Sequence, residues 1–223
     1  MKILSFLLLT ITLGLSTVVC ATPLEQGIAA YKSGEEAKAI KILQPLAVRG
    51  DAQAQYYLGL SYEYSPEATK WFQKAADQGH AKAQYFLYSQ YRDGIGVTQD
   101  SVQANKWLQR AAAGGSDSAQ YSLGLESAMA GSPGEAAKWY RLAAAQGHDK
   151  AQLMLARLYW DGQGIERNVV RAYMWLLLSA ETGNQTAKEE HALAEKRALT
   201  PQQVAQGRAK AQLCKSSSFK NCD

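Results

Sequence analysis

The chain has 223 residues, enough for a single domain of ordinary size, and a modest net charge of +4. Lys and Arg are spread along the sequence and form no basic stripe of the kind that tracks phosphates, so the composition argues against a nucleic-acid-binding protein. Alanine, leucine and tyrosine dominate the apolar residues, while valine and isoleucine are sparse, which favours helices over strands.

Residues 1–21 have the pattern of a secretion signal. Lys2 gives a positive start, residues 3–15 are mostly apolar, and Val19 and Ala21 place small residues at positions −3 and −1 of a cleavage site. A membrane anchor needs about 20 strongly apolar residues, and a lipid-modified cysteine would need other residues ahead of it. We therefore expect cleavage after Ala21, a periplasmic or secreted mature chain, and no stable membrane insertion.

Residues 22–50 are expected to form a capping pair of helices at the N-terminal end. Gly34 marks the turn between the two helices, and residues 35–48 have the pattern of an amphipathic helix. This pair lacks the tryptophan found in the later units, and terminal units of a repeat array often depart from the consensus in this way.

Four repeats follow, at residues 51–79, 80–115, 116–147 and 148–183. Each has an Ala-Gln pair, a leucine four residues after that alanine, then Ala-x-x-Trp, a pair of small residues and a glycine. Residues at i, i+4 and i+8 share one helical face, so the spacing predicts two helices per repeat, and the glycine suits a left-handed C-terminal cap. The tryptophans recur in every unit and are therefore expected in the core: Trp71, Trp107, Trp139 and Trp175.

All variation in repeat length falls in the loop between the two helices. The second and fourth repeats have a long Gly-x-Gly loop, whereas the first and third have a short loop with a proline at the first helical position. Ser132 and Glu135 also fit a capping box. The polar residues expected as N-caps of the second helices are Ser65, Asp100, Ser132 and Asn168.

Residues 184–223 are expected to close the C-terminal end of the array. Residues 184–199 predict one helix, and Thr200 followed by Pro201 predicts the start of another.

Signal cleavage would leave two cysteines, Cys214 and Cys222. Two cysteines eight residues apart in an exported chain are expected to form a disulfide. A loop this short pins the tail more than it stabilises the whole fold.

The unit A-x-x-x-L-G-x-x-Y, followed by G-x-G-V-x-x-D-x-x-x-A-x-x-W-x-x-x-A-A-x-x-G, resembles the Sel-one-like repeat, a relative of the tetratricopeptide repeat. The resemblance covers residues 51–197, with its fullest copy from Ala83 to Gly115, while Tyr88 and Ala156 replace the glycine after the leucine. It implies an all-α fold, a right-handed α/α superhelical solenoid of helix pairs with a concave groove, and an adaptor or scaffold role.

The sequence offers little support for catalysis. His80 and His148 occupy the same turn position in two repeats, and His191 is expected on an exposed, charged helix face. No nucleophile elbow, His-Glu-x-x-His helix or phosphate-binding loop is present. Ser217 and Lys220 fit Ser-x-x-Lys without its partner motifs. We therefore expect no catalytic residues, no bound metal and no cofactor.

In the related tetratricopeptide geometry, first helices line the concave face, so positions flanking the packed leucine point towards the groove. Aromatic and arginine side chains at such positions have the composition of protein-binding hot spots. The alternative is that the tyrosines pack between neighbouring first helices. The residues predicted to bind a protein partner are Tyr56, Leu60, Glu63, Tyr85, Arg92, Tyr121, Leu125, Arg157 and Trp160.

The sequence thus predicts a non-enzymatic periplasmic protein–protein interaction module with a protein partner in its concave groove. Exported members of the family include immunity proteins that neutralise toxic effectors, and the chain fits that role as well as it fits a scaffold. The alternative function is that of an enzyme acting on cell-wall or β-lactam substrates, to which some secreted cysteine-rich members are linked. Those members carry a cysteine pair in each repeat, and this chain does not.

Overall fold

The computed structural model describes residues 21–62, 65–219 and 222. The predictions for the secretion signal, Glu63 and Lys220 therefore fall outside the described residues. Every regular element in the described part is an α-helix, which confirms the all-α prediction. The helices are α1 (Pro23–Lys32), α2 (Glu36–Val48), α3 (Ala52–Ser61), α4 (Pro66–Asp77), α5 (Ala81–Asp93), α6 (Ser101–Ala113), α7 (Asp117–Met129), α8 (Pro133–Ala144), α9 (Asp149–Asp161), α10 (Val169–Glu181), α11 (Gln185–Arg197) and α12 (Pro201–Ser216).

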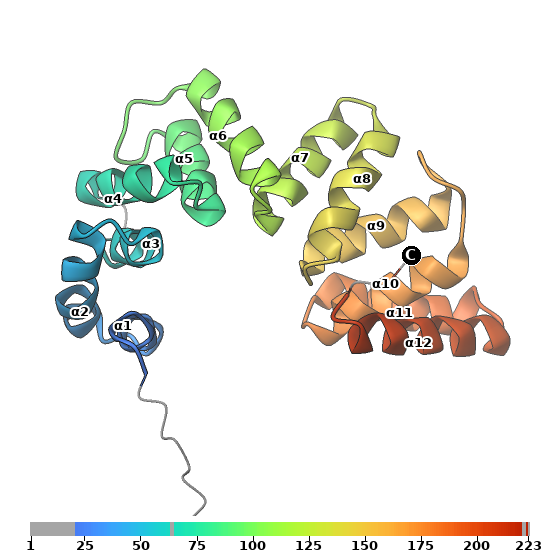
Figure 1. Cartoon of the computed structure of the whole chain (residues 1–223). Helices are drawn as coiled ribbons and strands as arrows, with labels where there is room; N and C mark the ends of the chain where they lie inside the picture. Colours follow the sequence, from blue (N-terminus) through green and yellow to red (C-terminus); the bar gives the residue numbers. More distant parts are fainter. Residues whose placement is uncertain (1–20, 63–64, 220–221, 223) are drawn as a thin grey trace, which may run out of the picture.

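The helix pairs follow one another around an arch (Figure 1). Each helix packs mainly against the helices before and after it in the chain, which is the contact pattern of a solenoid. In the N-terminal half, α1, α3 and α5 lie towards the inside of the arch, and α2, α4 and α6 lie towards its outside (Figure 1). Side chains of successive first helices therefore meet on the inner face.

The helix starts follow the predicted capping chemistry with one exception. Ser65, Asp100 and Asn168 each accept a hydrogen bond from a backbone N–H in the first turn of the helix that they precede. Ser132 makes no such bond, so the predicted capping box with Glu135 is wrong. Its ψ of 66° is lower than the 160°, 103° and 95° of Ser65, Asp100 and Asn168, and its hydroxyl makes no hydrogen bond to the first turn.

The glycine after each second helix has a positive φ, as predicted for a left-handed helix end. The next helix can then start at once in a new direction. The φ values are 87° at Gly79, 90° at Gly115, 84° at Gly147 and 104° at Gly183.

A glutamine that recurs in every repeat joins each first helix to the preceding unit. Its side-chain Nε2 donates to the carbonyl of the residue eight positions earlier, near the end of the preceding second helix. Each of these carbonyls also accepts from the N–H of the glycine three residues later, so the glutamine adds a second hydrogen bond that ties the two units together. The nitrogen–oxygen distances are 3.0 Å for Gln55, 3.0 Å for Gln84, 3.2 Å for Gln120 and 3.3 Å for Gln152.

The repeat tryptophans lie in the core, as expected. Trp71, Trp107 and Trp175 are exposed by only 7%, 5% and 1%. Trp139 is half-buried and packs against the core cluster of the middle repeats.

Two first helices carry a glycine where an aromatic ring of the second helix comes close. A Cβ on Gly59 would lie 2.7 Å from the Phe72 ring, and a Cβ on Gly124 would lie 2.4 Å from the Tyr140 ring. Both distances are too short for ordinary packing, so the aromatic side chain requires the glycine.

In the other two repeats, different residues occupy the two positions of this contact between the first and second helix. There the residue after the tryptophan is leucine, Leu108 or Leu176, and the first helix carries Tyr88 or Ala156 in place of glycine. All four side chains are buried. The two departures from the repeat pattern are therefore matched by a change across the helix pair.

Each long loop lies against the start of the second helix in the preceding, short-loop repeat. A Cβ on Gly96 would lie 2.9 Å from the Thr69 hydroxyl, and a Cβ on Gly164 would lie 2.2 Å from the backbone nitrogen of Gly134. Only glycine allows so close a backbone approach.

Two further helices, α11 and α12, follow the last repeat, as the sequence predicted. α10 packs against both α11 and α12, and α12 begins with a capping box between Thr200 and Gln203. Gly207 lets α12 approach the Tyr173 ring, since a Cβ there would lie 2.4 Å from it. Cys214 and Cys222 are joined by a disulfide, with a Cα–Cα distance of 4.6 Å.

The described helices include none with the length and apolar character of a membrane span.

Candidate partner-binding surface

Two hollows of similar size lie on the first helices, one in each half of the arch. The first has a volume of about 540 Å³ and is formed by α1 to α5 together with the loop after α5. Two predicted binding residues, Leu60 and Tyr85, contribute to it. The complete lining is Tyr31, Glu36, Leu60, Phe72, Tyr85, Phe86, Ser89, Gln90, Asp93 and Ile95.

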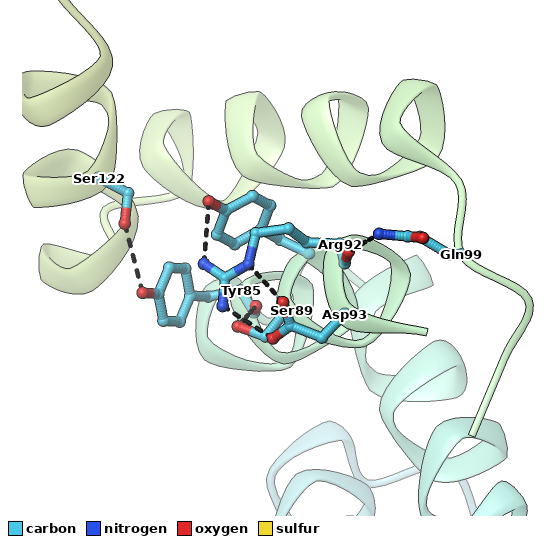
Figure 2. A network of polar contacts seen from close by, with 7 residues as sticks. Tyr85, Ser89, Arg92, Asp93, Gln99 and Ser122 are labelled. Atoms are coloured by element: carbon cyan, nitrogen blue, oxygen red, sulfur yellow. Dashed lines mark hydrogen bonds and ion pairs between the residues drawn. The ribbon is translucent and has the colours of Figure 1, made fainter. Parts of the chain in front are cut away.

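A polar network on α5, drawn in Figure 2, includes three residues of the cavity lining, Tyr85, Ser89 and Asp93. The Tyr85 hydroxyl lies 3.3 Å from the Ser122 Oγ and so links α5 to α7. Arg92 holds both carboxylate oxygens of Asp93 at 2.8 Å and donates to the Tyr88 hydroxyl at 3.2 Å. The hydrogen bonds from Arg92 hold the pKa of Asp93 below its usual range. The predicted binding residue Arg92 is thus already engaged within its own helix.

The second cavity, of about 510 Å³, lies between α9, α10 and α11. Two further predicted residues, Arg157 and Trp160, contribute to it. Arg157 reaches across to α11, where its Nε lies 3.1 Å from the Glu190 Oε1, and this contact raises the pKa of the guanidinium. The complete lining is Ala156, Arg157, Trp160, Asp161, Leu176, Glu190, Leu193, Ala194, Arg197 and Ala198.

The remaining predicted residues in the described part, Tyr56, Tyr121 and Leu125, do not line these two cavities. Tyr56 lines a smaller hollow together with His80. Tyr56 is only 8% exposed and stacks on the His80 ring, with centroids 4.5 Å apart, and burial raises its pKa to about 12. Tyr121 stacks on His148 at 4.7 Å, and Leu125 is half-buried against the C-terminal core cluster. For Tyr56 and Tyr121 the structure shows the packing described by the alternative interpretation.

The two histidines of these stacks are also helix caps. His80 Nδ1 accepts from the Ala83 N–H, and His148 Nδ1 accepts from the Ala151 N–H, both at 3.2 Å. Burial lowers the pKa of both imidazoles, which keeps the accepting nitrogen unprotonated. Their role is to start α5 and α9, and the cap position could be recognised from their equivalent place before x-Lys-Ala-Gln.

The third histidine differs from expectation. His191 is half-buried and stacks on Tyr173 with centroids 4.9 Å apart, so the prediction of an exposed helix face is wrong for this residue. The Tyr173 hydroxyl meets His191, Glu195 and Arg208, which join α10, α11 and α12. The Tyr173 side chain is fully buried, and this cluster ties the three helices together. Among the described residues no group of three metal-ligating side chains comes together.

The structure adds lining residues that sequence reasoning missed. Leu193 is 52% exposed although it is a large apolar residue, and it lies on the strongly charged helix α11. That isolated apolar position was a usable signal. Gln90 and Phe86 gave no such signal, because their place in the first cavity depends on how α5 packs against α3 and α4.

Comparisons with known proteins agree with this geometry. The Sel1 repeat profile matches residues 52–80, 81–116, 117–148 and 149–184. A crystal structure of a Sel1 repeat protein from Oxalobacter formigenes is similar, with 32% identity over 75% of this chain and 53% of that one, and a TM-score of 0.69. Another is c5321, a protective antigen present in uropathogenic Escherichia coli strains displaying an SLR fold, with 28% identity, 88% and 46% coverage, and a TM-score of 0.64.

The chain thus spans about half the length of these two proteins. A comparison with curated proteins gave no match. Sel1 repeat proteins generally mediate protein–protein interactions, and their fold is typically a non-enzymatic scaffold. Four matched repeats cover more than half of the sequence, and the chain therefore belongs to the Sel1 repeat family.

Proposed function

We propose that the chain is a non-enzymatic adaptor that holds a protein partner on the inner face of its arch, in the periplasm. The observation that carries this proposal is the pair of cavities on the first helices, one lined by Leu60 and Tyr85 and the other by Arg157 and Trp160. Partly apolar hollows with a few polar groups are the usual form of a hot-spot pocket.

The periplasmic location is supported by two features. The first 21 residues have the pattern of a cleavable signal, and the tail carries the Cys214–Cys222 disulfide, which persists in oxidising compartments. Cell fractionation followed by mass spectrometry of the purified chain tests this. Recovery of a chain that begins at Thr22 and has lost two protons from its thiols supports export. A full-length reduced chain in the cytoplasm contradicts it.

The binding proposal is tested by capture from an envelope extract with two matched baits. Leu193→Glu places a charge in the second cavity at a half-exposed position, and Val102→Glu makes the same exchange on α6, where the side chain is 76% exposed. Neither change removes a buried group, so circular dichroism should be unaltered. We expect the native chain and Val102→Glu to hold the same partner and Leu193→Glu to lose it.

Equal capture by both variants would show that the partner binds elsewhere. The identity of the captured protein separates the two forms of the proposal: a secreted toxic effector indicates an immunity protein, and an envelope enzyme indicates a scaffold. For the alternative enzymatic function, turnover of a chromogenic β-lactam by the pure mature chain is the decisive observation. Our proposal predicts that the pure mature chain does not turn over the β-lactam.

A further inference from the structure

The first cavity combines aromatic rings with negative charge. Four aromatic side chains line it, together with the carboxylates of Glu36 and Asp93. Among the described residues that line it, none is basic. The second cavity differs, since Arg157 and Arg197 balance Asp161 and Glu190 there. The first cavity is therefore the one whose chemistry is complementary to a cation.

Arg92 offsets the charge of Asp93 but leaves part of its hydrogen-bonding capacity open, and the carboxylate of Glu36 is the uncompensated negative charge of the cavity. Its guanidinium lies 5.1 Å from the centroid of the Tyr88 ring and grips Asp93 from that side. An ionised carboxylate has about four acceptor positions, and the two bonds from Arg92 use half of them. Glu36 has no ion-pair partner among the described residues and stands at the first turn of α2. Both acids thus remain able to accept hydrogen bonds from an incoming donor.

Gln90 supplies a third acceptor. Its side chain lines the cavity, is only 4% exposed, and has an Oε1 that no described group hydrogen-bonds. Burying an unpaired amide oxygen is costly unless a donor reaches it. The repeat does not account for this residue: the equivalent positions are Ser61, Glu126 and Leu158. Gln90 is therefore a local feature of this cavity and not part of the glutamine series that joins the repeats.

We propose that the first cavity takes an arginine side chain of the protein partner, with its guanidinium against the aromatic rings and its N–H groups directed to Gln90, Glu36 and Asp93. A guanidinium is planar, weakly hydrated and rich in donors, so it suits aromatic walls and several acceptors better than the compact ammonium of lysine does. The inference rests on the proposed adaptor function and specifies the chemistry of its partner.

The test uses short, capped alanine-rich peptides with one central arginine, citrulline, lysine or glutamate, titrated against the mature chain by fluorescence polarisation. Citrulline keeps the shape of arginine and removes its charge. We expect arginine to bind about three- to tenfold more tightly than citrulline, the range expected for a partly desolvated cation on aromatic rings. The preference should shrink as the salt concentration rises from about 50 mM to about 500 mM, because rim charges are screened.

Two acids that adjoin in sequence provide a matched control. Glu36→Gln removes a carboxylate of the cavity, whereas Glu35→Gln removes one that pairs with Lys38 and does not line it. Glu36→Gln should abolish much of the arginine preference, and Glu35→Gln should leave it unchanged. Gln90→Leu should also narrow the ratio of arginine to citrulline affinity. A merely structural role for Gln90 would change the urea midpoint and not this ratio.

Equal affinity for arginine and citrulline overturns the inference, as does an absence of saturable binding up to about 1 mM of the arginine peptide. Identical behaviour of Glu36→Gln and Glu35→Gln overturns it too. The adaptor proposal is judged separately by the Leu193→Glu capture. If Leu193→Glu no longer captures the partner and the arginine and citrulline peptides bind equally, the adaptor proposal is supported and the arginine site is refuted. Arginine selectivity with unaltered capture supports the site and removes the second cavity from the partner's footprint.

Discussion

The position after the packed leucine and the position after the tryptophan vary together. Gly59 faces Phe72 and Gly124 faces Tyr140, whereas Ala156 accompanies Leu176. The sequence revealed the departures from glycine but not their partners, because the contact joins two helices separated by a loop of variable length. Residue exchanges across a helix pair are invisible to a pattern read along one helix.

A methyl group added at Gly124 tests this packing. Gly124→Ala should destabilise the chain by about 1–3 kcal/mol because its Cβ would lie 2.4 Å from the Tyr140 ring. Helix propensity alone would favour alanine by about 1 kcal/mol, so the sign of the change is informative. Adding Tyr140→Leu should recover most of the loss. Urea unfolding followed by circular dichroism measures the three variants, and a Gly124→Ala chain more stable than the native one would refute the contact.

Site residues were predictable only in part. Leu60, Tyr85, Arg157 and Trp160 lie in the two cavities because their spacing from the packed leucine sets their direction. Tyr56 has the same spacing as Tyr85 but is covered by His80, a residue 24 positions further along the chain. Burial by a neighbouring repeat cannot be read from the spacing within one repeat.

Two helices, α5 and α9, have a histidine as their N-cap, and this makes the stability of the fold sensitive to pH. His80 and His148 cap α5 and α9 through an unprotonated Nδ1, and burial lowers the pKa of both below 6.5, with Lys82 adding to the effect at His80. Asp117 and Asp149 partly oppose it at His148. The folded chain therefore binds fewer protons than the unfolded chain as the pH falls.

The contribution of the two histidine caps to the free energy of unfolding should be fully present above about pH 6.5, the ordinary histidine pKa. It should be lost as the pH falls through the lower pKa values that these histidines have in the folded chain. Each lost cap is worth about 1 kcal/mol. Asparagine caps helices without titrating, so the double variant His80→Asn and His148→Asn should show a smaller drop in urea midpoint between about pH 7.5 and about pH 5.5. His191 keeps a residual dependence. An unchanged drop in the double variant would exclude the caps as its source.

The helices and their order followed from the sequence, since the spacings of alanine, leucine and tryptophan fix two amphipathic faces per repeat. The capping box at Ser132 failed, because a side-chain motif does not determine the backbone angle at its own position. The glutamine after the alanine was visible in every repeat, but its hydrogen bond to the preceding helix required the helix pairs to be placed in space.

In the molecule as a whole, each helix packs mainly against the helices next to it in the chain, so a destabilising substitution at one end should have only a local effect. Replacing Cys214 and Cys222 with alanine removes the bridge between two positions eight residues apart, one of which lies near the end of α12. Hydrogen exchange measured by mass spectrometry should show faster exchange in α10 to α12 and unchanged exchange in α3 to α5. Uniformly faster exchange along the arch would mean that the chain unfolds as one cooperative unit.

The long loops suggest how such an array can grow. The loops that contain Gly96 and Gly164 each pack against the preceding repeat, which has a short loop. Long-loop and short-loop repeats must therefore alternate for every long loop to make this contact. The heritable building block is then a pair of repeats, residues 51–115 or 116–183, and not a single one. Duplicating a pair would lengthen the arch with every junction intact. Inserting a single repeat would place two repeats with loops of the same length next to each other. Two long loops would clash, and two short loops would leave the contact unfilled.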